Sequence, residues 1–309
     1  MQEKIGNVVI QTQYYPGQDL YSDGEIQDRM LKIAQKYGDI EYSSVIAEEK
    51  SWPILYHFSH VRENIVNWLP ITKKDHVLEI GSGCGAITGT LAEQAGQVQC
   101  IELSKKRSMI NAYRHREKTN INILLGNFEE IEPNLVEKYD WITLIGVFEY
   151  SEKYIGTSEP YKEMLLRTKR HLKPNGKIVI AIENRLGLKY WAGCTEDHVG
   201  KYFEGIEGYA NTEGIKTFSR KELENIIRKT GNWKIDFYYP YPDYKLPMTV
   251  YSDKHLPNKG ELNNTRYNFD RERLQLFDET RVYDGIINNG LLQEFFNSFL
   301  VILEEKADE

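Results

Sequence analysis

The residues best suited to chemistry lie in one glycine-rich segment, residues 77–85, which reads VLEIGSGCG. Its glycines have the spacing G-x-G-x-G, and glycine lets a backbone approach a ligand closely. A dinucleotide site carries G-x-G-x-x-G, with the pyrophosphate at the N-terminus of the next helix. Here Glu79 lies two residues before Gly81. Its carboxylate would repel a pyrophosphate and attract a cation, such as an ammonium or a sulfonium.

A second acidic residue, Glu102, ends the next expected strand in the segment CIELS. It follows the glycines by about 20 residues, a spacing at which an acid accepts hydrogen bonds from both hydroxyls of a ribose. Nicotinamide and adenosyl ligands share this feature. The alternative is a surface glutamate that caps the helix expected to begin near Lys105.

A third signal follows the next expected strand, in the segment LGNFE. Asn127 could hydrogen-bond an adenine edge, and Phe128 could cover the face of that ring. A loop with a helix cap is the alternative for this pair.

Candidates for the second substrate leave the following strands. In an open α/β sheet the ligand crevice lies beyond the carboxyl ends of the strands. Glu149 and Tyr150 follow the fourth expected strand, and Glu183 and Asn184 follow the fifth. We therefore expect these side chains to point toward that crevice.

The segment TEDH supplies the best candidate for a general base, His198, because the unperturbed pKa of histidine lies near neutrality. Glu196 and Asp197 would orient His198 or bind hydroxyls of the acceptor. The alternative is a solvated or helix-capping histidine.

We predict no metal site from the sequence. His57 and His60 lie at i and i+3 without further ligands at suitable spacing. The cysteines, Cys84, Cys100 and Cys194, match no zinc or redox motif and are expected to be reduced thiols.

Short apolar strands alternate with helices, which predicts parallel βαβ units covered on both faces. The expected strands are residues 76–80, 98–102, 121–125, 141–145, 177–182, 233–239 and 299–303. The expected helices are about 24–37, 53–68, 86–95, 105–118, 159–172 and 290–297, with a capping box at Ser219. The pattern predicts an α/β, Rossmann-like, mostly parallel seven-stranded sheet. Residues 1–74 would form a helical N-terminal cap, and residues 75–309 the ligand-binding domain, with an insertion at about 240–290.

The composition is that of an ordinary soluble globular protein, with 309 residues, 40% hydrophobic and 28% charged. The net charge of −7 gives no general attraction to nucleic acid. We find neither a signal peptide nor an apolar run long enough to span a membrane. We therefore expect a cytoplasmic enzyme with a small-molecule or glycan partner, no nucleic-acid partner and no membrane insertion.

The segments VLEIGSGCGAIT, CIELS, GNFEE and YDWITLIGVFEY resemble the class I S-adenosylmethionine-dependent methyltransferases. The resemblance covers about residues 75–182, and the closing FLVIL is consistent with the family's last, antiparallel strand. It implies S-adenosylmethionine as cofactor. The residues that it implies for the cofactor are Glu79, Gly81, Gly83, Gly85, Glu102, Leu103, Asn127, Phe128 and Gly146. Asn127 departs from the aspartate that is most frequent in the family.

A looser resemblance covers ENRLGLKYWAGCTEDHVGKYFEGIEGY and FYYPYPDYKLP, which are similar to bacterial methyltransferase-like proteins that accompany glycosyltransferases in surface-polysaccharide assembly. We therefore predict methyl transfer to a hydroxyl of a carbohydrate or a small metabolite. His198 and Glu149 are the expected catalytic residues. The acceptor would contact Tyr150, Asn184, Glu196 and Asp197. A non-catalytic binding module and a nicotinamide-dependent oxidoreductase are the alternatives.

Overall fold

The computed structural model describes residues 2–19, 24–263 and 273–306. The chain divides into two compact units. Unit 1 consists of Met1–Ile145 and Arg167–Ile178, and unit 2 of Gly146–Leu166 and Val179–Glu309. Among the described residues, no helix combines the length and the apolar character needed to cross a bilayer.

Four parallel strands form the centre of unit 1: β3 (His76–Ile80), β4 (Gln97–Glu102), β5 (Ile121–Leu125) and β6 (Tyr139–Ile145). They are mostly apolar and buried, as expected for strands covered on both faces. Their hydrogen-bonded order is β5-β4-β3-β6. The order places the carboxyl ends of β3 and β4 side by side, because the two strands are parallel neighbours. The four strands confirm the predicted ones to within two residues.

The first residues of unit 1 differ from the expected helical cap. They form an antiparallel hairpin of β1 (Gln2–Ile5) and β2 (Val8–Gln11), and β2 pairs in parallel with β5. In β2, buried Val8 and Ile10 alternate with half-buried residues, the pattern of a strand with one covered face. A strand of four residues is too short to stand out in the sequence.

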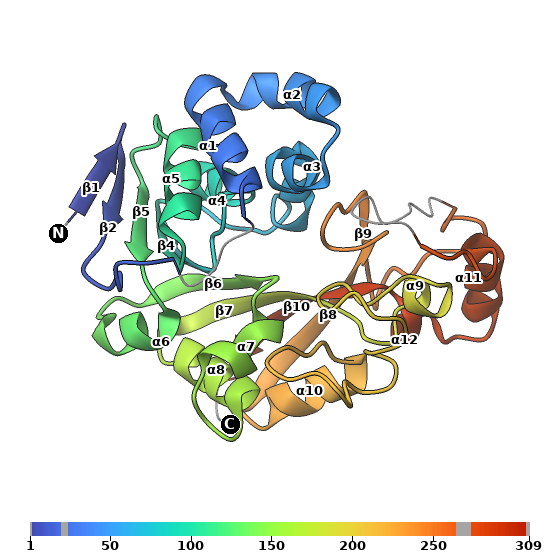
Figure 1. Ribbon diagram of the computed structural model, residues 1–309. Coiled ribbons are helices and arrows are strands. Elements are labelled where there is room, and N and C mark those ends of the chain that lie inside the picture. Colours follow the sequence, from blue (N-terminus) through green and yellow to red (C-terminus); the bar gives the residue numbers. More distant parts are fainter. Residues whose placement is uncertain (1, 20–23, 264–272, 307–309) are drawn as a thin grey trace. The chain divides into compact units, whose positions relative to one another are not determined.

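Helices α1 (Ile26–Lys36), α2 (Tyr42–Glu49) and α3 (Trp52–Phe58) do form a helical layer in unit 1, followed by a 3-10 helix, His60–Ile65. The predicted helix 53–68 is interrupted at Ser59, whose hydroxyl caps the 3-10 helix by accepting from the amide of Val61. The apolar side chains of α1–α3 share a core with Cys84 of the glycine loop and Ile110 of α5 (Lys105–Arg114). Figure 1 shows these helices beside α5 and α4 (Thr88–Gln94).

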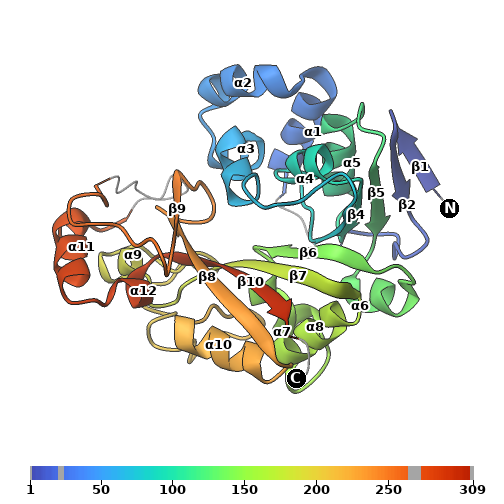
Figure 2. The same cartoon turned by 180° about the vertical axis from the view of Figure 1, so that it is seen from behind.

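Unit 2 is built on antiparallel strands. β10 (Ser298–Glu305) pairs with β8 (Trp233–Tyr241), which pairs with β9 (Thr249–Ser252). Figures 1 and 2 show β8 and β10 side by side. The helices of this unit are α7 (Ser151–Tyr154), α9 (Leu188–Trp191), α10 (Arg220–Arg228), α11 (Glu279–Asn288) and α12 (Leu292–Phe295). β9 and α11 lie within the predicted insertion, part of which falls outside the described residues.

The capping box predicted at the start of α10 is present. The Ser219 hydroxyl accepts from the amide of Glu222 (3.4 Å), and the Glu222 carboxylate accepts from the amide of Ser219 (2.9 Å). This pair fixes where the helix begins.

Two elements have residues in both units: α8 (Pro160–Lys169) and β7 (Leu172–Glu183). The full strand order is β1-β2-β5-β4-β3-β6-β7-β10-β8-β9. The sheet therefore has ten strands rather than the predicted seven, because β1, β2 and β9 were not expected. The short β6–α7 connection contains a 3-10 helix, Phe148–Tyr150.

Candidate functional site

The glycine loop follows β3 in unit 1. Gly81, Gly83 and Gly85 all have positive φ, at 74°, 54° and 78°. Gly81 is exposed and Gly83 half-buried, so their backbone is accessible to a ligand. Gly85 is buried, and a Cβ at this position would lie 2.5 Å from Oδ1 of Asn111 and 3.0 Å from Nε2 of His115. Gly85 is therefore required for the packing of the loop on α5.

Glu79 lies beneath this loop rather than at its surface. Its Oε2 accepts hydrogen bonds from the hydroxyl of Thr88 (2.6 Å) and the thiol of Cys100 (3.5 Å). Burial raises the pKa of Glu79 to about 7. The carboxyl is therefore partly protonated at neutral pH. Its hydrogen bonds stabilise the structure beneath the loop. This corrects the interpretation that its charge directly attracts a cationic ligand.

Glu102 ends β4 and organises the nucleoside edge of the loop. Its two oxygens accept from the amides of Gly83 (2.7 Å) and Ser104 (2.9 Å). An ionised carboxylate has about four acceptor positions, so about two remain for other donors. That these positions bind the two hydroxyls of a ribose stays a prediction.

The two residues of interest after β5, Asn127 and Phe128, have structural roles in the fold. Oδ1 of Asn127 accepts from the amide of Glu129 (3.3 Å) and caps α6 (Phe128–Ile131), which is the alternative given above. This cap does not use the amide group's NH₂. Phe128 is 6% exposed, and its stacking on adenine stays a prediction. Leu103, beside Glu102, is half-buried and offers apolar surface at this edge.

Residues 12–19 cross the carboxyl ends of β4 and β5, and no sequence pattern predicted this. Asp19 accepts from the amide of Lys105 (2.7 Å) and the hydroxyl of Ser104 (2.8 Å) at the start of α5. Partial burial opposes ionisation, but these hydrogen bonds lower the pKa of Asp19. Tyr14 lies against Gly126, where an added Cβ would be 2.7 Å from the Cβ of tyrosine. Residues 12–19 therefore adjoin the edge expected to hold the nucleoside.

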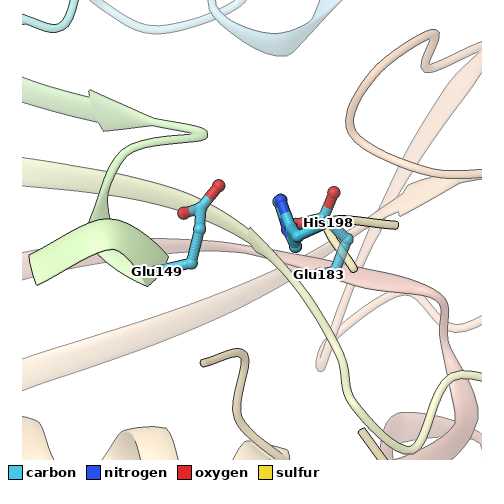
Figure 3. A group of neighbouring side chains, drawn as sticks. All are labelled: Glu149, Glu183 and His198. Atoms are coloured by element: carbon cyan, nitrogen blue, oxygen red, sulfur yellow. The ribbon is translucent and has the colours of Figure 1, made fainter. Parts of the chain in front are cut away.

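In unit 2, Glu149, Glu183 and His198 come together, although 49 residues separate the first from the last. One donor atom of each lies within 4.8 Å of the others, and Figure 3 shows the three side chains as neighbours. Nε2 of His198 lies 3.3 Å from Oε2 of Glu183, and its Nδ1 lies 3.1 Å from the hydroxyl of Tyr150. The structure thus brings together the predicted residues of two strand ends and of the TEDH segment.

Glu149 is fully buried, and neither of its carboxyl oxygens has a hydrogen-bond partner among the described residues. Burial, with the charge of Glu183, raises the pKa of Glu149 to about 8. Burial alone would lower the pKa of His198, but the charge of Glu183 outweighs it, and the pKa rises to about 9. At neutral pH the protonated forms of Glu149 and His198 are therefore favoured, that of Glu149 chiefly by burial and that of His198 by the charge of Glu183.

Two lysines complete the surroundings of this cluster. Nζ of Lys245 contacts Oε1 of Glu183 (2.9 Å) and Oδ1 of Asp197 (2.6 Å), and Nζ of Lys189 contacts Oδ2 of Asp197 (2.7 Å). Tyr190 also donates to Asp197. Asp197, expected to bind the acceptor, is instead 5% exposed within a network of buried ions. The sequence did not suggest the lysines, since Lys245 lies 48 residues from Asp197.

Glu196 positions the backbone around His198. Its carboxylate accepts from the amides of His198 and Val199, each at 2.7 Å, and from the hydroxyl of Tyr209 (3.0 Å). Glu196 thus orients the backbone of His198.

Asn184 and Gly146 also have structural roles within the fold. The side-chain amide of Asn184 donates to the carbonyls of Glu294 and Phe296, both at 2.8 Å. Gly146 has a φ of 68°, and an added Cβ would lie 2.9 Å from the hydroxyl of Tyr244. Asn184 therefore anchors the chain before β10, and we do not carry it into the acceptor site.

A cavity of about 320 Å³ lies elsewhere in unit 1 and is lined by His76, Gln97 and Ile121 among others. His76, Gln97 and Ile121 are the first residues of β3, β4 and β5. The cavity is thus at the amino ends of the strands, the edge away from the glycine loop.

Comparison with known proteins agrees with this arrangement. The family model described as a methyltransferase domain matches residues 78–178. The ubiquinone biosynthesis O-methyltransferase of Rickettsia typhi is 28% identical over 184 residues, covering 58% of this chain and 70% of that protein. The ribosomal RNA small subunit methyltransferase A of Clostridium botulinum is 29% identical over 176 residues, covering 55% and 61%.

Among solved structures, the complex between the Haloferax volcanii Trm112 methyltransferase activator and a putative methyltransferase matches with a TM-score of 0.50 and 16% identity. The match covers 88% of this chain and 98% of that one, and it supports the fold. These comparisons support a class I S-adenosylmethionine-dependent methyltransferase. It is an enzyme whose cofactor is S-adenosylmethionine, and the nicotinamide alternative is set aside.

Proposed function

We propose that the protein methylates a hydroxyl oxygen of a carbohydrate or a small metabolite. S-adenosylmethionine, when bound, supplies an electrophilic methyl group on its sulfonium. The acceptor hydroxyl passes its proton to the unprotonated form of Glu149 or His198, its oxygen forms a bond to the methyl carbon, and the sulfur keeps the electron pair of the broken S–C bond. The observation that carries the proposal is the buried, partnerless carboxyl of Glu149 beside the His198–Glu183 pair.

The donor is assigned to the glycine loop and the end of β4. The backbone at Gly81 and Gly83 is open, and Glu102 has acceptor capacity for the ribose hydroxyls. Replacing Glu102 with alanine should weaken binding of S-adenosylhomocysteine, measured by calorimetry. Replacement with glutamine should weaken it less, because the amide oxygen still accepts.

The acceptor is assigned to Glu149, His198 and Tyr150 in unit 2. A buried carboxyl without a partner is unfavourable for folding, so a functional reason for keeping it is expected. A hydroxyl donor of the acceptor would supply that missing hydrogen bond. The segment 146–149, GVFE, lacks the Asn/Asp-Pro-Pro-aromatic sequence of amino-group methyltransferases, which favours an oxygen acceptor.

The test measures S-adenosylhomocysteine released by the full chain with sugar nucleotides and hydroxylated small metabolites as acceptors. Glu149→Gln and His198→Ala should lower acceptor-dependent turnover by about 100-fold or more while leaving cofactor binding intact. Glu204→Gln, which changes another buried carboxylate of unit 2, is the control. Cofactor binding by wild type without turnover on any acceptor would favour the non-catalytic binding module. Turnover that survives in both variants would show that the acceptor residues are wrongly assigned.

A further inference from the structure

We propose that Glu149, Glu183 and His198 form a binding site for one divalent transition-metal ion, Mn²⁺ or Zn²⁺. The existence of this site is independent of the reaction, but its purpose rests on the function proposed above. Nothing in the sequence suggested it, since no two of the three residues lie at a metal-ligand spacing.

The geometry suits one shared ion. One donor atom from each residue lies within 4.8 Å of the other two. Ligands that each stand about 2.0–2.4 Å from one ion are separated from one another by up to roughly 4–5 Å. The three donor atoms are therefore close enough together to share one ion, and Figure 3 shows the three side chains as neighbours.

Glu149 is the independent sign that something binds here. It has no exposed surface, and both carboxyl oxygens are without hydrogen-bond partners in the described part of the chain. Its side chain extends toward the other two residues (Figure 3). A carboxylate in this state has a large desolvation cost, which coordination to a cation would offset.

The other two ligands, His198 and Glu183, are each oriented by a neighbouring side chain. Nδ1 of His198 lies 3.1 Å from the hydroxyl of Tyr150, so its N–H can donate to that oxygen and leave Nε2 for the ion. Oε1 of Glu183 is held by Lys245 at 2.9 Å, which leaves Oε2 on the side of His198. Metal-binding histidines and carboxylates usually have such supporting hydrogen bonds.

The charges in the cluster also call for a cation. Among the described residues, the carboxyl groups of Glu149, Glu183 and Asp197 lie with the ammonium groups of Lys189 and Lys245 and the imidazole of His198. Asp243, which is 3.6 Å from Lys189, and the buried carboxylate of Glu196 add to the negative side. A divalent ion would offset part of this negative charge.

The ligand types indicate which ion binds. Mg²⁺ and Ca²⁺ prefer sites made of oxygen atoms, whereas imidazole together with carboxylates suits Mn²⁺ and Zn²⁺. Three protein ligands leave positions open for an acceptor oxygen. Coordination would lower the pKa of an acceptor hydroxyl, which is how the ion would assist methyl transfer.

The test uses the full chain, freed of metal by a chelator and dialysed, without cofactor or acceptor. Mn²⁺ binding is followed by electron paramagnetic resonance and Zn²⁺ binding by calorimetry. We expect one ion per chain, with affinity at least about tenfold weaker in Glu149→Gln and in His198→Ala. The control, Glu204→Gln, should bind like wild type.

Misfolding is separated from lost binding by thermal denaturation without metal. Glu149→Gln removes a carboxyl that has no partner, so its midpoint should equal or exceed that of wild type. Mn²⁺ should raise the midpoint of wild type and not that of the variant. Absence of one-to-one binding of either ion, or unchanged binding in Glu149→Gln, would overturn the site. Metal binding without methyl transfer would support the site and count against the proposed function, whereas methyl transfer unaffected by chelation would limit the ion to a structural role.

Discussion

Replacement of Gly85 by alanine tests the claim that the third glycine of the loop serves packing. Its φ is 78°, where an alanine costs about 1–2 kcal/mol. Gly24, also in unit 1, has the same φ of 78°, but no atom of the described residues lies within 4 Å of an added Cβ. Gly24→Ala therefore measures the backbone cost alone.

The difference between the two variants follows from the contacts of Gly85. An added Cβ would lie 2.5 Å from Oδ1 of Asn111 and 3.0 Å from Nε2 of His115. Asn111 would have to leave the hydroxyl of Thr88 (3.1 Å), and His115 the carbonyl of Gly85 (2.9 Å). Two buried hydrogen bonds at about 1 kcal/mol each, with groups left unsatisfied, give about 2–4 kcal/mol beyond the control.

The assay is urea denaturation of wild type, Gly85→Ala and Gly24→Ala, together with calorimetric binding of S-adenosylhomocysteine. We expect the free energy of unfolding to fall in the order wild type, Gly24→Ala, Gly85→Ala. Cofactor affinity should fall only in Gly85→Ala, since the loop must shift. Equal stability of the two variants would refute the packing argument.

The remaining predictions concern one ionisable group, one helix cap and one internal amide. Burial raises the pKa of Glu79 to about 7 in the folded chain, from 4.5. Its contribution to stability is therefore full below about pH 4.5 and is lost as pH rises through about 7, by about 3 kcal/mol. Glu79→Gln should remove that part of the pH dependence, measured as the difference from wild type in urea midpoints between pH 5 and pH 8. Ser219→Ala should lower the free energy of unfolding by about 1 kcal/mol through loss of the helix cap, and an unchanged value would contradict the capping role. Asn184→Ala should lower it by about 2–3 kcal/mol without changing cofactor affinity, because both of its amide hydrogen bonds reach backbone carbonyls. A selective loss of acceptor turnover in stable Asn184→Ala would restore its predicted acceptor role.

The sequence located the strands of the cofactor-binding sheet and the residues of the glycine loop. β3 and β5 have the predicted bounds, because short apolar runs between turn residues are strong local signals. The same holds for the capping box at Ser219, whose hydrogen bonds join residues three apart. β1 and β2 were missed, since strands of four residues depend for their stability on the strands they pair with, β2 for β1 and β5 for β2.

The direction in which side chains point could not be predicted from the sequence. Glu79 was expected to face a ligand, but in β3 it lies beside Cys100 of the neighbouring strand and beneath Thr88. Successive side chains of a strand point to opposite faces, and only the finished sheet shows which face is covered by α4. Asp19 is a similar case, since its hydrogen-bond partners in α5 are 85 and 86 residues away.

The sequence by itself determined the class of the protein, because the segments that carry the family resemblance are contiguous, with fixed residue types and spacing. Tertiary structure alone decided that Glu149, Glu183 and His198 form one buried cluster, and that Lys245 supports it. The physical reason is that charge, burial and the lack of a hydrogen-bond partner depend on residues brought together from distant parts of the chain, and these quantities have no counterpart in local sequence.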